Sequence, residues 1–388
     1  MRDGLRLPRR TLTRLANGLV EHGMPPSWLG YRRVRKIPFA RYVQEAGHLS
    51  DGLEVIHPES VAINPLPANI ADRDQLPADA GWWGYSFRDV PSRKSGATLR
   101  ATLRDVLVVP CANAEKEFWV SILSPGGASI ELREISFRPW QATAIRRKRR
   151  RRIARATWGL ERVFHNHSHW LTAHLPKLLL LQEQGALREL LLPETLPTGV
   201  EACLQFYGID VSSLPRFGPD ELLQVDQLTL LSTDRFRPEL LRKVRTHCPI
   251  PAARNPTRRI YISRARAQRR RLLNEAEIWP QFEAAGFESV CMEALSFEEQ
   301  VRLMRETAVL AAPHGAGLTN MIFCPPETDV VELADLSFPN PNFYALASAM
   351  ELRYWLVSAD GIGDGHPLTR DMQVDPAAVE RVLTQLKS

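Results

Sequence analysis

The segment 311–320, which reads AAPHGAGLTN, holds residues whose types and spacing suit the binding of an anion. Small apolar residues end a predicted strand there, and two glycines lead into a predicted helix. A helix start offers unpaired backbone N–H groups and the positive end of a dipole, which together favour phosphate. The glycines would let a phosphate approach the backbone, although the same pair could serve only the geometry of a turn.

Side chains of this segment could complete such a site. His314 could donate a hydrogen bond to a phosphate oxygen, and Asn320 could hold a hydroxyl of a ribose or another sugar. The candidate binding residues are His314, Gly315, Ala316, Gly317, Leu318 and Asn320.

A second candidate follows the predicted strand 259–263, where the sequence continues as Ser-Arg and then becomes rich in arginine. Ligands of open α/β sheets bind at the carboxyl ends of the strands. Arginine suits phosphate there because its planar fork can engage two oxygens at once. We therefore expect Ser263, Arg264 and either Arg270 or Arg271 to contact a ligand, while most neighbouring arginines stay solvated.

Histidines cluster in a third segment, 165–174, at the start of a predicted helix. Their spacing is not that of HExxH and no carboxylate stands at a ligand offset, so we expect no metal site. His169 is our candidate for a general base, since histidine titrates near neutral pH. Its alternative role is a core histidine satisfied by a hydrogen bond.

The sequence Asp72-Arg73-Asp74 matches the two-aspartate pattern that binds a metal-nucleotide complex in some sugar transferases. It lies in a proline-rich segment without a preceding apolar strand. We therefore interpret the match as chance.

The elements that position the first two candidates alternate regularly along the carboxyl-terminal part of the chain. Strands are predicted at 259–263, 287–291, 308–312, 329–334 and 352–357, with helices between them. Ser296 and Glu299 form a capping box before one helix, and Asn274 is the expected N-cap of another. Five strands alternating with helices predict a parallel, doubly wound nucleotide-binding domain.

The rest of the chain is less regular. We predict an irregular region over 1–100 and an α/β domain over 101–250. A nucleotide-binding domain over 251–360 and a terminal loop and helix over 361–388 would follow. Strands are expected at 106–109, 118–123, 130–137, 160–164 and 187–192, and a helix at 170–184.

Composition and charge narrow the class of protein. With 388 residues, of which 44% are hydrophobic and 24% charged, the chain is neither disordered nor fibrous. No window approaches 18 consecutive apolar residues, and the five cysteines form no paired framework, so a cytoplasmic location is expected. Positive charge gathers at 146–152, which reads RRKRRRR and is either a solvated linker or helix face, or a contact to anionic lipid at the inner membrane face.

Four pieces of the sequence resemble glycosyltransferase family 61, a family that includes capsular polysaccharide biosynthesis proteins of bacteria. In the family's order they are NHSHWLTAHLPKLLLL (166–181), RIYISRARAQRRRLLNEAEI (259–278), FESVCMEALSFEEQVRLM (287–304) and AVLAAPHGAGLTNMIFCPPETDVVEL (308–333). Residues 1–155 show no resemblance. The resemblance makes Asn166 and His169 the candidate catalytic pair and adds Glu332 to the binding residues.

The resemblance implies a GT-B fold, in which two Rossmann-like domains face a cleft, with the acceptor on the side of 101–250 and the nucleotide sugar in 251–360. It also implies metal-independent, inverting transfer of a sugar, usually from a UDP-sugar, to a glycan or a lipid-linked saccharide. Arginines and a helix start can stabilise the departing diphosphate in place of a cation. The alternative is a protein that binds an anionic polymer or nucleic acid without catalysis. No zinc-finger spacing or RNA-recognition signature supports nucleic acid as a partner.

Overall fold

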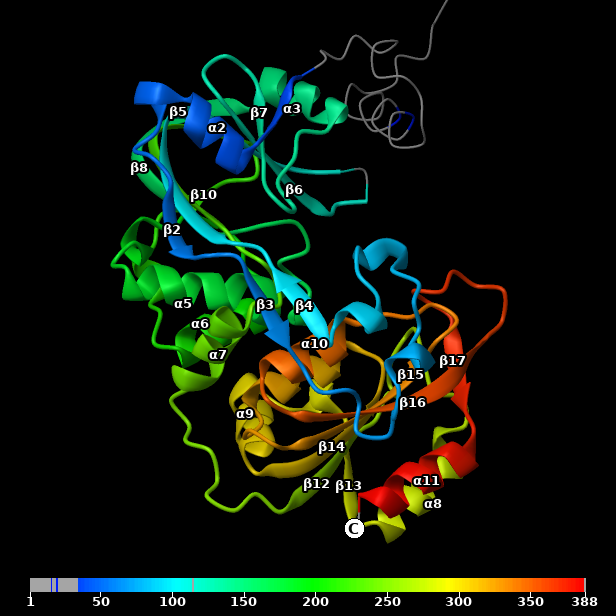
Figure 1. Ribbon diagram of the computed structural model, residues 1–388. Helices are drawn as coiled ribbons and strands as arrows, with labels where there is room; N and C mark the ends of the chain where they lie inside the picture. Colours follow the sequence, from blue (N-terminus) through cyan, green and yellow to red (C-terminus); the bar gives the residue numbers. More distant parts are fainter. Residues whose placement is uncertain (1–14, 16–18, 20–33, 114, 387–388) are drawn as a thin grey trace, which may run out of the picture.

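The carboxyl-terminal part of the chain forms a six-stranded sheet in the order β13-β12-β14-β15-β16-β17 (Figure 1). The computed structural model describes residues 15, 19, 34–113 and 115–386. The strands are β12 (Arg258–Ile262), β13 (Phe287–Val290), β14 (Thr307–Pro313), β15 (Asp329–Asp335), β16 (Arg353–Ile362) and β17 (Asp371–Val374). The first five are parallel, which confirms the predicted doubly wound order. The sixth, β17, is an antiparallel strand in a segment expected to hold only a loop and a helix.

Helices cover both faces of this sheet. They are α8 (Glu275–Ala284), α9 (Phe297–Arg305), α10 (Asn342–Ala349) and α11 (Pro376–Gln385). Helices α8 and α11 share one apolar core with one sheet face, and α9 and α10 share the larger core. The capping box of Ser296 and Glu299 is confirmed. Asn274 stands at the N-cap position of α8 as expected, but its side chain bonds to the backbone of Val374 and forms no capping hydrogen bond.

The amino-terminal sheet has seven strands and a different construction. They are β1 (Lys36–Pro38), β2 (Glu54–His57), β5 (Thr98–Ala112), β6 (Phe118–Leu123), β7 (Ser129–Glu131), β8 (Arg149–Trp158) and β11 (Glu221–Ser232). Only the pairs β1–β7 and β11–β8 are parallel, and the other pairings are antiparallel. The expected second Rossmann-like domain is therefore not what this sheet forms. Its antiparallel neighbours need no crossover helix between strands.

The basic run is not a linker, because it passes from an exposed helix end into this sheet. It spans the end of α3 (Ala142–Arg147) and the first half of β8. Arg149 and Arg151 pair with Glu221, and Arg152 pairs with Asp226 on the adjacent strand at 2.9 Å. The apolar segment 160–164, expected as a strand, is instead the turn that follows β8.

Helices pack against one face of the amino-terminal sheet (Figure 1). The predicted helix 170–184 is present as a π-helical turn, Trp170–His174, that continues into α5 (Leu175–Glu183). The short α4 (His167–His169) precedes it. The region 187–192, expected as one strand, holds a 3-10 turn and ends in the two-residue strand β9. The remaining elements are α2 (Phe39–Glu45), α6 (Thr198–Phe206), α7 (Pro238–Thr246), β9 (Leu192–Pro193) and β10 (Arg216–Phe217).

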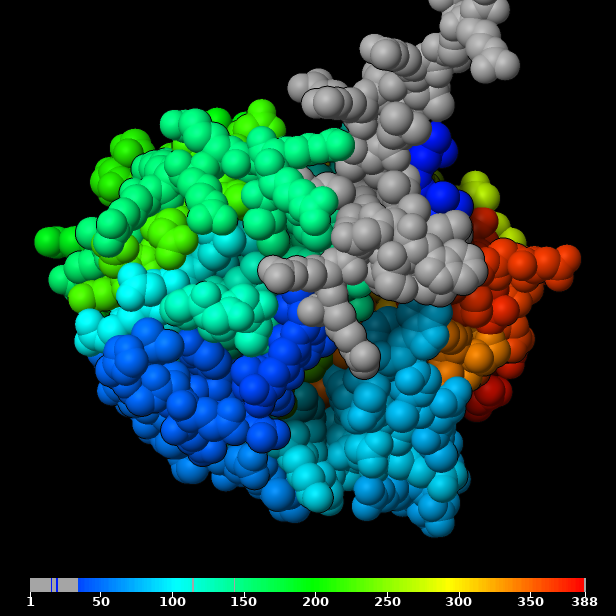
Figure 2. All heavy atoms as spheres, turned by 90° about the horizontal axis from the view of Figure 1, so that it is seen from above, coloured from blue at the N-terminus to red at the C-terminus, as the bar shows by residue number. Residues whose placement is uncertain are grey.

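Residues 64–91 leave the amino-terminal part and lie on the carboxyl-terminal sheet (Figures 1 and 2). The hairpin of β3 (Ser60–Ile63) and β4 (Ser92–Ser95) frames this segment. The Asn69 side chain forms two hydrogen bonds with the backbone of Leu356, and Tyr85 donates to Asn342 at 2.8 Å. No pattern in the sequence predicted a role for residues 64–91 in the site. In the structure this segment covers the sheet edge that holds the candidate site.

One large apolar core runs through both halves and includes residues of β5, β11, α5, α7, β14 and α10. The boundary predicted after residue 100 falls inside β5. No helix within the described ranges is both long and apolar enough to cross a membrane.

Candidate active site

The candidate site lies where the strand order of the carboxyl-terminal sheet reverses. Chain order places β13 on one side of β12 and β14 on the other. The carboxyl ends of β12 and β14 therefore flank a switch point, where open α/β sheets bind ligands. Ser263 and Arg264 follow β12, and His314 and Gly315 follow β14. The structure thus brings the first two sequence candidates together.

Arg264 and Gly315 fit against each other. A Cβ atom added to Gly315 would lie 2.0 Å from Arg264 Nη1. The φ angle of Gly315 is 178°, which any residue adopts, so space rather than backbone conformation requires glycine here. The room expected for a phosphate at Gly315 is thus occupied by the guanidinium of Arg264, which corrects the sequence analysis. In the 3-10 helix Ala316–Phe323, the first backbone N–H that donates a hydrogen bond is that of Leu318, which donates to the carbonyl of Gly315. The N–H groups of 315–317 precede it at the helix start.

Hydrogen bonds to two backbone carbonyls and one carboxylate hold the arginine-rich loop in place. Arg264 donates through Nε to the carbonyl of Arg270 at 2.9 Å and through Nη2 to the carbonyl of Arg269 at 2.7 Å. Glu275 accepts hydrogen bonds from the Ser263 hydroxyl and from Arg264 N–H. Ser263 therefore orients the loop and is not free to bind a ligand.

The sequence did not distinguish Arg270 from Arg271 as the binding residue, but their surroundings in the structure differ. Arg271 is exposed and pairs with Asp371 at 2.7 Å. Arg270 lies in the site and forms no ion pair among the described residues. Burial, with repulsion from Arg264, lowers the pKa of Arg270 to about 10. A partly buried cation without a counter-ion is poised to bind an anion, so Arg270 is the stronger candidate of the two.

His314 is oriented by a buried carboxylate. Its Nδ1 lies 2.5 Å from Glu332 Oε1, and Glu332 also accepts a hydrogen bond from the Tyr354 hydroxyl at 2.6 Å. Burial keeps the pKa of Tyr354 well above its usual range, so this hydroxyl stays a donor. The Nε2 of His314 faces the Asn340 amide nitrogen at 3.2 Å. This network assigns the proton to Nδ1, and the lone pair of Nε2 accepts a hydrogen bond from the Asn340 amide.

Asn320 does not reach a ligand in this arrangement. It is fully buried and bonds to His167 Nε2 at 3.1 Å, to Gln300 and to the Gly317 carbonyl. The hydroxyl-binding role expected of Asn320 is therefore not available without breaking these bonds. Instead, Asn320 joins the helix start at 167 to the carboxyl-terminal half.

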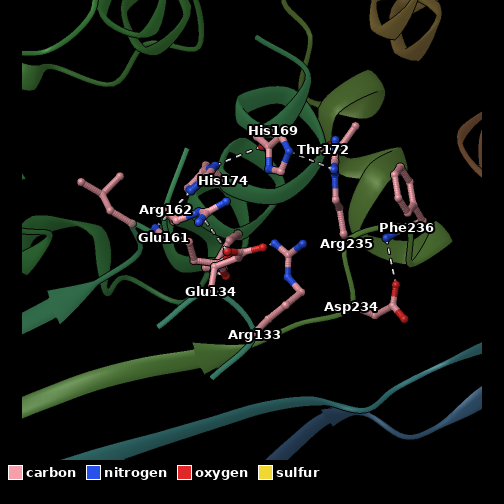
Figure 3. A network of polar contacts seen from close by, with 12 residues as sticks. Arg133, Glu134, Glu161, Arg162, His169, Thr172, His174, Asp234, Arg235 and Phe236 are labelled. Carbon is pink, nitrogen blue, oxygen red and sulfur yellow. Dashed lines mark hydrogen bonds and ion pairs between the residues drawn. The ribbon is translucent and has the colours of Figure 1, made fainter. Parts of the chain in front are cut away.

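His169 lies in a separate polar network on the amino-terminal side (Figure 3). Its Nε2 faces Arg235 Nη1 at 3.4 Å, and its backbone N–H donates to Asn166, the N-cap of α4. Burial and the nearby Arg235 lower the pKa of His169 to about 2. The near-neutral pKa assumed for His169 as a general base is therefore wrong in this environment.

The same network contains a buried ion group that fixes its shape. Glu161 bonds to Lys177 and Arg133, both at 2.5 Å. His174 Nε2 accepts from Glu161 N–H at 3.1 Å, and its Nδ1 donates to the carbonyl of His169 at 3.0 Å. Both ring nitrogens are thus used in the neutral form. Burial accordingly lowers the pKa of His174 to about 4.

Two pockets adjoin the Arg264–Gly315 contact. The first, of about 330 Å³, is lined by Ser263, Arg264, Met292, Glu293, Gly315 and Gly317. The second, of about 400 Å³, is lined by Trp83, Arg270, His314, Phe338, Asn340 and Arg370. One elongated ligand could therefore occupy the switch point and extend past Arg270 toward His314.

The aspartate pair has a structural role, as expected of a chance match. Asp72 caps a 3-10 turn over Arg73–Gln75, and Asp74 pairs with Arg88 at 3.2 Å. Nowhere in the described part of the chain do three His, Cys, Asp or Glu side chains gather as metal ligands would. Metal independence itself stays a prediction.

A doubly wound sheet with a basic, glycine-containing edge defines the class of nucleotide-binding α/β proteins. Within that class, residues 167–331 match the family model Glycosyltransferase 61, which confirms the resemblance seen in the sequence. The match spans β12 to β15 and the segment that carries His169.

Curated proteins give the same result. Over 163 residues the chain is 33% identical to a beta-1,2-xylosyltransferase of Oryza sativa subsp. japonica, covering 39% of this chain and 28% of that one. Over 113 residues it is 34% identical to the EGF domain-specific O-linked N-acetylglucosamine transferase of Drosophila melanogaster, covering 28% and 21%. The chain thus spans less than a third of the length of these relatives.

A solved structure, the iron-containing dodecameric glycosyltransferase TibC of enterotoxigenic E. coli H10407, aligns over 70% of this chain and 81% of its own. The TM-score is 0.30 and the identity 11%, so no conclusion is drawn from this likeness.

Sequence reasoning missed two parts of the site. Arg235 follows a strand of the amino-terminal sheet, and nothing in the local sequence distinguishes it from other arginines. Trp83 and Tyr85 come from the proline-rich segment, 200 residues or more before the loops they contact. Their only signal was two adjacent tryptophans between glycines, at 81–84.

Proposed function

We propose that this protein is a glycosyltransferase that moves a sugar from a nucleotide sugar, a UDP-sugar, to a hydroxyl group of a glycan. The observation that carries the proposal is the switch-point edge itself. Arg264, Arg270 and the N–H groups of 315–317 meet there beside His314, inside the segment that matches glycosyltransferase 61. The names of the relatives, xylosyltransferase and N-acetylglucosamine transferase, support transfer of a sugar.

The donor's diphosphate would lie between the two pockets. Arg270 and the free donors of 315–317 would carry its charge, and Arg264 would hold the loop that presents Arg270. These groups would stabilise the negative charge that grows on the leaving diphosphate, as preorganised donors do in other enzymes. They supply this without a divalent cation, so we propose metal-independent transfer.

The reaction would proceed with inversion in one step. The acceptor oxygen would attack the anomeric carbon from the face opposite the diphosphate, and its proton would pass to a base. The bond from the anomeric carbon to the phosphate oxygen would break, and its electron pair would leave with the nucleoside diphosphate. We assign the base to His314 rather than His169, because the Glu332 carboxylate orients His314 and an acceptor hydroxyl in the pocket would replace the Asn340 amide at Nε2.

The remaining expectations from the resemblance extend this proposal. Two halves that face each other across a cleft would place α4, with Asn166 and His169, on the wall opposite the donor edge; the contact of His167 with Asn320 supports this. A lipid-linked acceptor at the inner face of a membrane would suit the exposed arginines of 146–152. The amino-terminal sheet would then take part in acceptor binding through a topology of its own.

Calorimetry with UDP in the presence of EDTA tests the proposal. We expect UDP to bind without a metal, and single-stranded nucleic acid of equal charge not to compete. Arg264→Ala should weaken UDP binding by about one to two decades, since it removes a charged group and releases the loop. Arg266→Ala, in the same loop but exposed, should change it little. Binding that requires Mg²⁺ would overturn the metal-free mechanism, and preference for nucleic acid would favour the non-catalytic alternative.

A further inference from the structure

A solvent-exposed aromatic cluster stands at the rim of the pocket lined by Arg270 and His314. Trp82 is 65% exposed, an unusual state for so large an apolar side chain. Its ring meets the edge of Phe338 at a centroid distance of 5.7 Å and lies 5.0 Å from His366. Phe338 itself lines the pocket, so the exposed face of Trp82 continues the pocket wall outward.

Trp82 is held by contacts from two directions. Trp83, the next residue, packs against Phe338 at 5.9 Å and lines the pocket as well. Three residues from Trp82 along the chain, Tyr85 bonds to Asn342. The aromatic rim is therefore fixed to the loop after β15 and to the start of α10, although it belongs to a distant part of the chain.

The pocket behind the rim combines apolar and polar groups in a particular way. Trp83, Phe338 and Leu368 supply flat or apolar surface. Asn340 and the ion pair of Arg370 with Asp335, at 2.6 Å, supply planar polar groups. A sugar ring has the matching surfaces, since its C–H groups form an apolar face and its hydroxyls form a polar edge.

We infer that Trp82 and the pocket behind it form a binding subsite for the saccharide acceptor, with Trp82 as a stacking platform for a sugar ring. This inference rests on the proposed function and names where the acceptor lies. His314 also lines the pocket, and its Nε2 would exchange the hydrogen bond from the Asn340 amide for one from the acceptor hydroxyl. An acceptor of several sugar units would pass over the rim and cover the exposed ring of Trp82. A single nucleobase would instead sit within a closed slot, which an exposed ring does not provide.

The subsite includes residues both before and after the family match, which covers 167–331. Trp82 and Trp83 precede the matched segment, and Phe338 and His366 follow it. The matched segment would thus supply the donor edge, and the aromatic rim would set which acceptor this particular chain takes.

The test measures binding of three hexasaccharide probes, the β-1,4-linked oligomers of glucose, xylose and N-acetylglucosamine, by calorimetry and ligand-observed NMR. The wild-type protein should bind at least one of them. Trp82→Ala should weaken that binding about fivefold to tenfold, and Trp82→Phe should restore most of it. UDP affinity should not change in either variant. Ile63→Ala is the matched control, because Ile63 is 80% exposed but lines neither pocket.

Activity assays with any acceptor that works should show the same split, a raised acceptor KM with little change in kcat. Weaker UDP binding with unchanged saccharide binding in Trp82→Ala would overturn the inference and make the rim a nucleobase site. Transfer activity by a wild-type protein that binds none of the probes would also overturn it. If the probes bind through Trp82 but UDP does not bind at all, the subsite stands and the proposed transferase function fails.

Discussion

Two histidines, His314 and His169, stand on opposite sides of the candidate site and have opposite surroundings. His314 Nδ1 lies against a buried carboxylate, Glu332. His169 is buried and faces the guanidinium of Arg235, and both surroundings oppose a positive charge on its ring. The same residue type therefore has a carboxylate partner in one half of the molecule and an arginine partner in the other.

This difference changes how the amino-terminal half contributes. A histidine held neutral with its Nε2 toward an arginine is a hydrogen-bonding and packing group, not a base at neutral pH. Asn166 caps the helix that carries it, so both residues position α4. The segment would then shape the cleft, while proton transfer falls to the carboxyl-terminal half.

Replacing each of the two histidines in turn should have the largest effect on kcat. His314→Ala should lower kcat by about 10²–10⁴-fold, because a positioned base contributes that much. His169→Gln, which keeps a hydrogen-bonding side chain, should change kcat by less than about tenfold. Steady-state kinetics with one nucleotide sugar and one acceptor would measure both, with thermal unfolding as the control for folding. The reverse order of effects would return the base to His169 and leave His314 as a phosphate contact.

The close contact between Arg264 and Gly315 offers a second test, which concerns UDP binding by the carboxyl-terminal half. Gly315→Ala should displace the guanidinium and weaken UDP binding by about tenfold or more, since the new Cβ would overlap Nη1. Gly317→Ala is a matched control two residues on, where the nearest atom would be Ile262 Cγ2 at 3.3 Å. Calorimetry with UDP provides the comparison. Equal losses in both variants would mean that Arg264 does not depend on this space.

The buried neutral histidines predict a pH dependence of stability. The folded state holds the pKa values of His169 and His174 below their unfolded value near 6.5. The unfolded chain therefore binds more protons once pH falls below about 6.5, and the free energy of unfolding should decrease. Each proton contributes a slope of up to about 1.4 kcal/mol per pH unit, and that of His174 ends near pH 4.

Urea unfolding between pH 7 and 4 would measure this slope. His174→Gln should be less stable at pH 7 but should show a shallower decline, and the exposed His48→Gln should keep the wild-type slope. An unchanged slope in His174→Gln would contradict the assignment of a neutral buried imidazole.

The smallest effect concerns the basic run, because Glu221 and Asp226 already offset part of its charge. We expect weak, salt-sensitive binding to vesicles that contain anionic lipid, at about 1 kcal/mol for each remaining free charge near the surface. Replacing the exposed Arg146 and Arg150 with Gln should abolish it, whereas Arg152→Gln should matter less. Vesicle co-sedimentation at two salt concentrations would decide, and binding unaffected by salt would remove lipid charge as its cause.

The sequence by itself determined much of the carboxyl-terminal half. Alternating apolar strands and capped helices are local patterns, so the strands β12 to β16 and the residues at their ends could be predicted from them. The meeting of Arg264 with Gly315 followed from the rule that parallel strands share a carboxyl edge. The capping box of Ser296 was also readable, because its two residues are three positions apart.

Only the tertiary structure decided the electrostatics and the second wall of the site. The arginine run became a strand because Glu221 and Asp226, some 70 residues away, neutralise it on the neighbouring strand. Burial and the nearby Arg235 lower the pKa of His169, and His314 gained a carboxylate partner from the next strand. Trp82 reached the pocket through a segment with no regular pattern of its own. Local sequence patterns fix hydrogen-bonding periodicity, but a pKa or a pocket wall depends on groups that only folding brings together.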